Sequence, residues 1–273
     1  MPILIPTQPL TSEPLVFLRR ALLPLVIASL AGCGSGAAVD VQASSAPPRI
    51  DRELAACRTS MAGGQPPAVA DDAALRGLCF EAFAVVHDAT TRTPKVVLEA
   101  IDRASLSAAQ AVPRVDHFYE EARLPAAERS TLADYRGSGY DRGHLAPAAD
   151  MPTVGGSAQS FSLANMVPQV PSHNSGAWSR VERDTRSYAM RAPGVVYVAT
   201  GAVFDASPDG IGPGQRVRVP AVLFKLVHDA TTGRSWAHWQ QNAAGTASGA
   251  PISHTDLVQR LGYDPMPGVA HLN

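Results

Sequence analysis

The sequence lacks an excess of charge of either sign. In 273 residues, 23 Lys and Arg face 24 Asp and Glu, which gives a formal net charge of -1. Without a basic tail or a strong overall positive field, binding of a polyanion would have to depend on a local patch. The balance argues against a dedicated nucleic-acid-binding module but allows an enzyme that contacts a few phosphates. A content of 45% hydrophobic and 17% charged residues predicts a globular chain with a sizeable core, organised as one domain.

The N-terminal region has an apolar run, but the run is too short to span a bilayer as a helix. It covers residues 21–32 and follows Arg19 and Arg20. A charged flank, a short apolar stretch and small residues are typical of an export signal. The run ends in Leu-Ala-Gly-Cys at residues 30–33, which resembles the lipobox of bacterial lipoproteins. This resemblance implies cleavage before Cys33 and diacylation of its thiol; the alternative is an ordinary secretory signal with an incidental cysteine.

The export signal suggests three segments. We expect residues 1–32 to be a signal peptide with a lipobox, residues 33–50 a flexible tether, and residues 51–273 the folded domain. The stretch 34–48 is low in large apolar residues and holds two prolines, which is the composition of a tether. The expected location is the bacterial cell envelope, on the periplasmic side, with the protein anchored by lipid to the membrane, in particular the outer membrane.

The chain has three cysteines, and removal of the lipidated Cys33 from the count leaves an even pair, Cys57 and Cys79. In an exported protein such a pair predicts a disulfide, worth roughly 3 kcal/mol in the chain-entropy model. The alternative is two buried free thiols, which a cytosolic location would favour.

Hydrophobic periodicity predicts both strands and helices. Apolar and β-branched runs indicate strands at 80–86, 95–100, 161–166, 195–201, 217–227 and 235–239. The string His-Asp-Ala-Thr-Thr follows two of these runs, at 87–91 and 228–232. We interpret it as one kind of turn used in two hairpins.

Two segments read as helices. One covers 175–190, with an apolar side formed by Trp178, Val181 and Ala189, and Asn174 suits its N-cap. The other covers 253–262 and ends at a glycine. Hairpins mixed with a few helices predict an α+β fold.

The segment 134–147 contains the most informative motif, in which Asp141, Arg142 and His144 surround Gly143. A histidine has an unperturbed pKa of about 6.5, so that much of it is neutral near pH 7 and can act as a general base. The glycine lets the backbone turn tightly or approach a ligand closely. Taken alone, a histidine at such a bend is more often structural.

A second polar cluster begins thirty residues later, with Asn174, Glu182 and Arg186. Hydrolysis of a phosphodiester needs a base that activates water, a cation that neutralises developing charge, and groups that hold the phosphate. His144 can be the base, and Asn174 offers the neutral oxygen that a hard divalent ion accepts. Arginines can bind the phosphate. The structural alternatives are a helix cap for Asn174 and a surface ion pair between Glu182 and Arg186.

Three motifs together resemble the DNA/RNA non-specific endonuclease family. They are Tyr-Asp-Arg-Gly-His-Leu-Ala-Pro at 140–147, Asn-Met-Val-Pro-Gln at 165–169, and Asn-x-Gly-x-Trp-x-x-x-Glu at 174–182. The resemblance extends from about residue 80 to residue 262. It implies the ββα-metal nuclease fold, in which an antiparallel sheet forms the core and helices flank it.

The resemblance also implies a role for each site residue. His144 would be the proton acceptor, and Asn174 would be the sole direct protein ligand of Mg²⁺, or of Mn²⁺ in its place. Glu182 would orient metal-bound water and so belongs, with His144, to the catalytic group. Arg142 and Arg186 would contact phosphate. Arg114 lies where the family carries an arginine for transition-state or leaving-group charge.

These expectations describe a magnesium-dependent endonuclease that hydrolyses both DNA and RNA without strong base discrimination. Two alternatives remain at this point. One is a non-catalytic, nuclease-like binding lipoprotein, and the other is a phosphodiesterase that acts on small nucleotides. The presence of both His144 and Asn174 favours an enzyme over the binding protein.

Overall fold

The computed structural model describes residues 47–206 and 209–269. The expected signal peptide, Cys33 and most of the expected tether therefore lie outside the described residues. The first helix, α1 (Arg49–Glu53), begins two residues before the expected start of the domain and buries Ile50. Within the described part of the chain, none of the helices combines the length and apolar character needed to cross a membrane.

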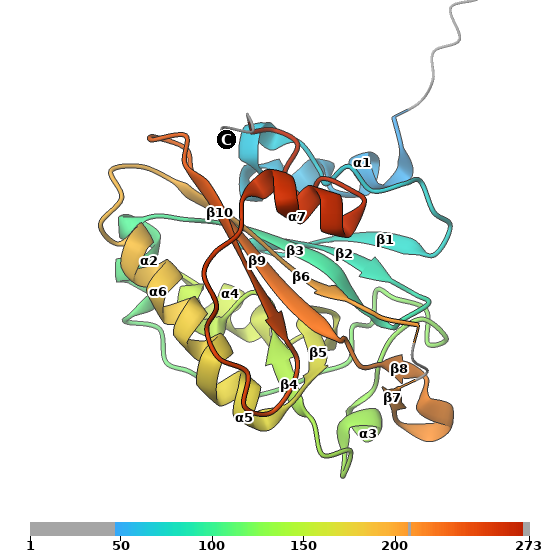
Figure 1. The fold of residues 1–273 in the computed structure, drawn as a ribbon. Coiled ribbons are helices and arrows are strands. Elements are labelled where there is room, and N and C mark those ends of the chain that lie inside the picture. Colours follow the sequence, from blue (N-terminus) through green and yellow to red (C-terminus); the bar gives the residue numbers. More distant parts are fainter. Residues whose placement is uncertain (1–46, 207–208, 270–273) are drawn as a thin grey trace, which may run out of the picture. The chain divides into compact units, whose positions relative to one another are not determined.

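A six-stranded antiparallel sheet forms the centre of the domain, with strand order β1-β2-β3-β6-β9-β10 (Figure 1). Its strands are β1 (Leu75–Cys79), β2 (Phe83–Asp88), β3 (Thr93–Ile101), β6 (Val196–Val203), β9 (Val222–Asp229) and β10 (Ser235–Gln241). The expected strands near 80–100, 195–201 and 235–239 are thus present, whereas β1 is an additional strand.

The two hairpins of this sheet use the same turn, as the repeated string predicted. After β2, Asp88 Oδ1 accepts the backbone N–H of Thr90 at 2.8 Å, and after β9, Asp229 Oδ1 accepts that of Thr231 at 2.9 Å. The expected strand 217–227 is wrong as a single element. Pro220 interrupts it, because proline cannot donate to a strand ladder.

The strand segment before Pro220 pairs elsewhere: β8 (Val217–Arg218) joins β7 (Gly210–Ile211) in a separate two-stranded unit. The remaining elements are short. They are α2 (Arg103–Ala109), α3 (Leu132–Tyr135), α4 (Val154–Ser160), α7 (His254–Leu261) and 3₁₀ turns at Ala55–Ser60, Ala62–Gly64, Ala148–Asp150, Leu163–Asn165 and Pro213–Gln215.

Side chains alternate along each strand, so the strands present apolar residues on both faces of the sheet. Both faces are covered by other elements. On one face Val86, Leu98 and Leu226 pack with α1 and with Leu257 of α7. On the other face Val85 and Leu223 pack beneath the helical layer that contains α2, α4 and α6 (Ser179–Ala189) (Figure 1). The candidate site belongs to this second layer.

The expected ββα unit lies on that second face. It consists of β4 (Asp141–His144), β5 (Met166–Gln169) and a helical run made of α5 (Pro171–His173), a π-turn (Asn174–Trp178) and α6 (Ser179–Ala189). The expected strand at 161–166 is wrong: residues 163–165 form a 3₁₀ turn, and the strand starts at Met166. Pro168 is tolerated in β5 because this two-stranded sheet has no further partner on that side.

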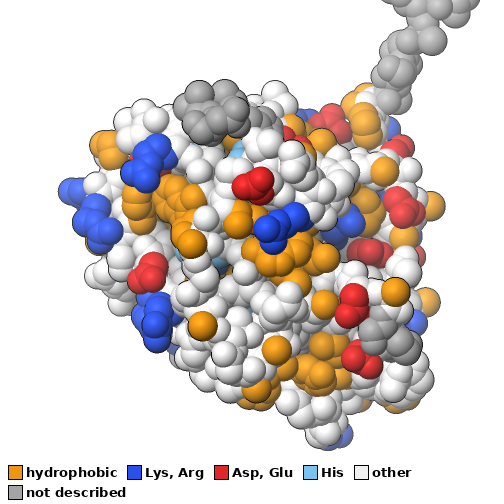
Figure 2. Space-filling model, in the orientation of Figure 1, with side chains coloured by type: hydrophobic (Ala, Val, Ile, Leu, Met, Phe, Trp, Pro, Cys, Tyr) orange, Lys and Arg blue, Asp and Glu red, His pale blue; other side chains and the backbone are white. Residues whose placement is uncertain are grey.

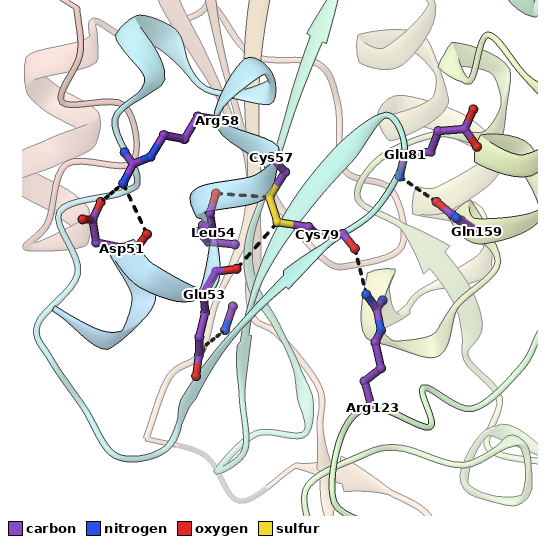
Figure 3. The surroundings of a disulfide bond; sticks show 10 residues. Asp51, Glu53, Leu54, Cys57, Arg58, Cys79, Glu81, Arg123 and Gln159 are labelled. Atoms are coloured by element: carbon purple, nitrogen blue, oxygen red, sulfur yellow. Dashed lines mark hydrogen bonds and ion pairs between the residues drawn. A yellow bond between two sulfur atoms is a disulfide. The ribbon is translucent and has the colours of Figure 1, made fainter. Parts of the chain in front are cut away.

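The predicted Cys57–Cys79 disulfide is present, with an S–S distance of 2.06 Å (Figure 3). It joins the 3₁₀ turn after α1 to the end of edge strand β1. Two further bonds support this corner: Glu53 Oε2 accepts the backbone N–H of Gly77 at 2.6 Å, and Arg123 Nη1 donates to the Cys79 carbonyl at 2.8 Å. The disulfide and the Glu53 bond fix the N-terminal segment of the domain to the sheet, and the Arg123 bond attaches a third segment to the same corner.

Candidate active site

The glycine of the Arg-Gly-His motif is required by close packing between the paired strands. Gly143 lies opposite Val167 in the β4–β5 pair. A Cβ atom at Gly143 would collide with the side-chain amide of Gln169. That amide is itself engaged, because its Nε2 lies 3.1 Å from Nδ1 of His173. Gly143 thus allows the strand that carries His144 to lie directly against Gln169 of the paired strand, which in turn contacts His173 of the helical run.

The loop after His144 is held by one fully buried side chain. Asn165 Oδ1 accepts the backbone N–H of Ala146 at 3.0 Å, and its Nδ2 donates to the carbonyls of Ala146 and Ser160 at 2.9 and 2.8 Å. All of these bonds are shielded from water, so they fix the chain direction immediately after the candidate base. This accounts for the asparagine of the second motif.

The helical run starts earlier than the sequence predicted, and Asn174 is not its N-cap. Val170 occupies the N-cap position, and Pro171 is the first helical residue, a position that suits proline. Asn174 has helical dihedral angles (φ -55°, ψ -54°) and opens the π-turn. His173 beside it is buried and lies 3.0 Å from Gln240 Oε1 as well as near Gln169, so its role is structural.

The π-turn places Asn174 and Glu182 on one face of the helical run. Eight positions in a regular α-helix leave two side chains about 80° apart around the axis. A π-turn takes up one extra residue, so eight positions act as about seven, which is a same-face spacing. Both residues accordingly line the same cavity, while Trp178 and Val181 point into the core.

This cavity has a volume of about 850 Å³ and is formed by β4, the π-turn, α6, the 3₁₀ turn at 148–150 and the segment 132–140. It brings together all six residues expected to act on substrate or metal. These are Arg114, Arg142, His144, Asn174, Glu182 and Arg186.

The cavity is locally basic, although the chain as a whole is not. Five arginines line it, at positions 114, 136, 142, 183 and 186, against two acidic residues, Asp141 and Glu182. On the face drawn in Figure 2, by contrast, Lys and Arg side chains lie at separate positions among acidic, polar and hydrophobic ones. The cavity is therefore the kind of local patch that a phosphate backbone requires.

The orientation of Asn174 suits it to a hard cation. Its Nδ2 donates to Oδ2 of Asp141 at 2.9 Å, and a carboxylate can only accept, so this bond fixes which end of the amide is which. The amide oxygen is left as the acceptor end on the cavity wall. Neutral amide oxygens are ligands that Mg²⁺ and Mn²⁺ accept while they retain most of their water. The residues present therefore fit a divalent ion.

His144 has the environment of a neutral base. Its ring packs edge-on against Phe161, with centroids 5.0 Å apart, and lies 5.8 Å from the ring of Phe118. Burial, assisted by the positive charge of Arg114, lowers the pKa of His144 to about 3. Its Nε2 is buried, and no described residue bonds it. A buried nitrogen of this kind is where a water or substrate atom completes the site.

Glu182 lies above a buried charge network. Burial raises the pKa of Glu182 to about 7; Lys225 opposes this shift, and Asp150 adds to it. Asp150 is bound to Arg186, with Nη1–Oδ1 at 2.7 Å, and this ion pair holds the arginine at the cavity. Lys225 donates to Thr200 Oγ1 at 2.6 Å beneath the helical run.

Two arginines of the expected site, Arg142 and Arg114, lie against aromatic rings. The guanidinium carbon of Arg142 lies 4.1 Å from the ring centroid of Phe118, and that of Arg114 lies 5.4 Å from Phe161. Arg114 also pairs with Asp116 at 2.6 Å, in an exposed position. Contact with an aromatic face restricts a guanidinium and leaves N–H groups at its edge available to other partners.

Sequence reasoning missed several residues of the site. The sequence alone did not indicate that Asp141 and Asn174 are bonded to each other. It did not identify Arg136 and Arg183, which line the cavity, or Asp150, which binds Arg186. For Asp150 and Arg183 a signal existed, since each lies within a few residues of a motif position.

Comparison with known proteins gives one consistent result. A model of the DNA/RNA non-specific endonuclease family matches residues 69–261. Mitochondrial endonuclease G of Homo sapiens is 34% identical over 165 residues, which cover 56% of this chain and 55% of that protein. Nuclease C1 of Cunninghamella echinulata var. echinulata is 39% identical over 128 residues, covering 45% and 50%. The chain thus spans about half the length of the curated relatives it matches.

A solved structure has the same fold. It is the crystal structure of the EndoG/EndoGI complex, determined to explain how EndoG is inhibited. Its fold matches that of this chain with a TM-score of 0.62 at 24% sequence identity. The match covers 68% of this chain and 84% of that one. The similarity supports the α+β arrangement of an antiparallel sheet with flanking helices.

Proposed function

Because this chain belongs to the DNA/RNA non-specific endonuclease family and has its ββα-metal fold, we propose that it hydrolyses phosphodiester bonds within DNA and RNA. The observation that carries the proposal is the single cavity in which His144, Asn174 and Glu182 meet five arginines. This combination provides a base, a metal-holding oxygen and groups that bind phosphate. A protein that only binds nucleic acid needs neither the base nor the metal-holding oxygen.

The chain's own residues account for the chemistry. His144 is neutral near pH 7 and takes a proton from the attacking water. Arg142 and Arg186 bind the non-bridging oxygens of the phosphate, and Arg114 neutralises charge on the leaving oxygen. Asn174 would hold a divalent ion through its amide oxygen, and Glu182 would accept hydrogen bonds from water molecules that accompany the ion. Such an ion, when bound, supplies positive charge against the charge that develops on the phosphate.

These contacts go to phosphate and not to the edges of bases. Phosphate contacts position a nucleic acid but carry no sequence information. Cleavage of both DNA and RNA at many sequences follows from such a site. The cavity therefore suits an endonuclease of low base selectivity more than an enzyme that recognises one small nucleotide.

The test is incubation of the purified protein with circular plasmid DNA and with RNA, in Mg²⁺, in Mn²⁺ and in EDTA. We expect metal-dependent cleavage, with a rate reduced about 10²–10⁴-fold in His144→Ala, as for loss of a general base. His117→Ala is the matched control, because His117 is exposed and does not line the cavity. Absence of cleavage with metal, or full cleavage by His144→Ala, would refute the proposal.

We also propose that the protein is exported and anchored by lipid on Cys33, with the folded domain on the periplasmic side of the cell envelope. The support is the charged flank, apolar run and lipobox-like residues 30–33. Metabolic labelling with a fatty-acid analogue should mark the wild-type protein and not Cys33→Ser. Labelling that persists in this variant would contradict the anchor. An anchored position outside the cytoplasm would keep a non-specific nuclease away from the cell's own chromosome.

A further inference from the structure

A second cavity of about 430 Å³ adjoins the candidate active site. One wall is the end of α2 and the residues after it, and the opposite wall is the C-terminal half of α6. Figure 1 shows these two helices side by side on the same face of the sheet. The two cavities share part of their lining: Arg114, Ala148, Ala149, Arg183 and Arg186.

We propose that this second cavity is a nucleoside subsite, which receives a base and sugar next to the scissile phosphate. The proposal rests on the proposed function, because it deepens the same site. Arg186, which we assign to phosphate, and Arg114, which we assign to the leaving oxygen, belong to both cavities. Whatever lies in the second cavity is therefore adjacent to a bound phosphate, and in a nucleic acid that neighbour is a nucleoside.

The composition of the walls matches a nucleobase. Leu106, Ala109, Val112 and Met190 give an apolar lining for the faces of a flat ring. A volume of 430 Å³ falls within the range of pockets that hold small ligands.

The polar groups of the subsite suit any base. Gln110 offers an amide, and Ser157 and Ser187 offer hydroxyls. An amide and a hydroxyl each donate and accept hydrogen bonds, so these groups can adapt to different base edges. A subsite of this composition would add affinity for nucleotides without selecting one base, in keeping with a non-specific nuclease.

The subsite is preformed by contacts between its two helices. Arg103 Nε donates to the Met190 carbonyl at 2.9 Å, which joins the start of α2 to the end of α6. Leu106 packs with Ala189 and Val198 in one core cluster. A reciprocal capping box between Asp102 and Ser105 fixes the start of α2. Little ordering is then needed on binding, which favours affinity.

Arg183 lies at the boundary of the two cavities. It is exposed and lines both, and its Nη1 donates to Ser179 Oγ at 2.5 Å, one turn earlier in α6. A cation in this position is available to a phosphate on either side of the bound nucleoside. The subsite therefore has an apolar interior and a positively charged boundary with the catalytic cavity.

The test fills the subsite from its α6 wall. Ser187 lines the second cavity but not the first, and it is exposed, so Ser187→Trp should fold; Ser187→Ala is the matched control. Binding of thymidine 5′-monophosphate and of inorganic phosphate is measured by calorimetry with Mg²⁺. We expect the wild type to bind the nucleotide at least about tenfold more tightly than phosphate, as for burial of a small apolar group. Ser187→Trp should lose this preference and keep its affinity for phosphate.

A kinetic measurement separates this proposal from the proposed function. The same variants are assayed on an oligonucleotide and on a backbone of the same length whose sugars carry no bases, so that the control substrate brings no flat ring to the subsite. Ser187→Trp should lose about tenfold in kcat/KM on the oligonucleotide only. Gln110→Trp, which fills the subsite from the α2 wall, should do the same.

Each result has a distinct meaning. Equal binding of nucleotide and phosphate by the wild type, or an unchanged preference in both Trp variants, would overturn the subsite while cleavage of nucleic acid continued. A protein that prefers nucleotide to phosphate but cleaves no nucleic acid would refute the endonuclease proposal and leave the subsite standing.

Discussion

The carboxylate of Asp141 accepts a hydrogen bond of 2.9 Å from the side-chain amide of Asn174, across 33 positions of the chain. The bond joins β4 to the π-turn, and so connects the strand that carries His144 to the residue expected to hold the metal. It also determines which atom of the Asn174 amide is presented to the cavity. We therefore expect the aspartate of the motif to act through the asparagine.

Asp141→Ala should therefore weaken metal binding. Loss of a residue that orients a metal ligand typically reduces affinity or activity 10–100-fold. We expect the Mg²⁺ concentration for half-maximal cleavage to rise by about this factor, measured on plasmid DNA. Asp184→Ala, which changes an exposed aspartate on α6, is the control and should leave the metal dependence unchanged. An unaltered metal requirement in Asp141→Ala would contradict the assigned role.

The lowered pKa of His144 predicts the pH range over which it can act. A general base works in its neutral form, and the pKa of His144 lies at about 3, below its usual 6.5, so it stays neutral as the pH falls from 7 to 5. Titration of the ring signals by NMR should show no protonation of His144 in this interval. Arg114→Gln removes a positive charge that lowers the pKa of His144, so this substitution should raise that pKa. A titration midpoint of His144 at or above 6.5 in the wild type would contradict the lowered pKa.

The ion pair of Asp134 and Arg216 predicts a pH-dependent contribution to stability. Burial alone would raise the pKa of Asp134, but the bonds from Arg216 and Thr131 outweigh it and lower the pKa below 3.8. The stabilisation is complete above about 3.8 and is lost as the pH falls through the lower, folded-state value. Asp134→Asn should reduce the free energy of unfolding by about 2 kcal/mol at pH 7. This value lies between those typical of buried and of exposed ion pairs, because Asp134 is buried and Arg216 is partly exposed.

Urea denaturation at a series of pH values measures this effect. The difference between wild type and Asp134→Asn should shrink below pH 3.8 and vanish once the wild-type carboxyl is protonated. A constant difference at all pH values would show that the ion pair does not account for it. Asp134 adjoins Tyr135 and Arg136, which line the catalytic cavity, so a fall in kcat/KM in this variant would reflect displacement of that wall.

Removal of the disulfide should affect stability and not catalysis. The double variant Cys57→Ser, Cys79→Ser should lose about 3 kcal/mol, since the bridge closes a loop with a sequence separation of 22. For a domain of this size, that corresponds to a fall in Tm of roughly 6–12 °C by calorimetry. The value of kcat/KM should not change, because neither cysteine lines the cavity. An equal Tm with and without the bridge would be inconsistent with its structural role.

The sequence was sufficient to predict which residues meet at the site, because the chemistry of each motif is local. His144 lies in one short stretch and Asn174 and Glu182 share another, and any fold that uses them as a phosphodiester site must bring the two stretches together. The helix at 253–262 was equally predictable, since a capping box at Ser253 and a left-handed Gly262 mark its two ends.

The sequence was not sufficient where a distant partner decides the structure. Asp141 bonds a residue on another element, and no periodicity reveals that partner. Asn174 resembles an N-cap in composition, yet Pro171 starts the helix earlier. Residues 161–166 alternate as a strand would, but Asn165 turns inward to bond Ala146, and the strand begins after it. In each case a tertiary contact outweighs local preference.

The π-turn has a consequence for how such chains tolerate insertions and deletions. In a regular α-helix, two residues seven positions apart would present their side chains as Asn174 and Glu182 do here at a separation of eight. Loss of one residue within 175–177 could thus be absorbed by straightening the helix, with both ends of the site retained. Within this segment, a one-residue gap between two chains need not signal loss of the site, and the geometry of the turn is a better criterion than the number of residues.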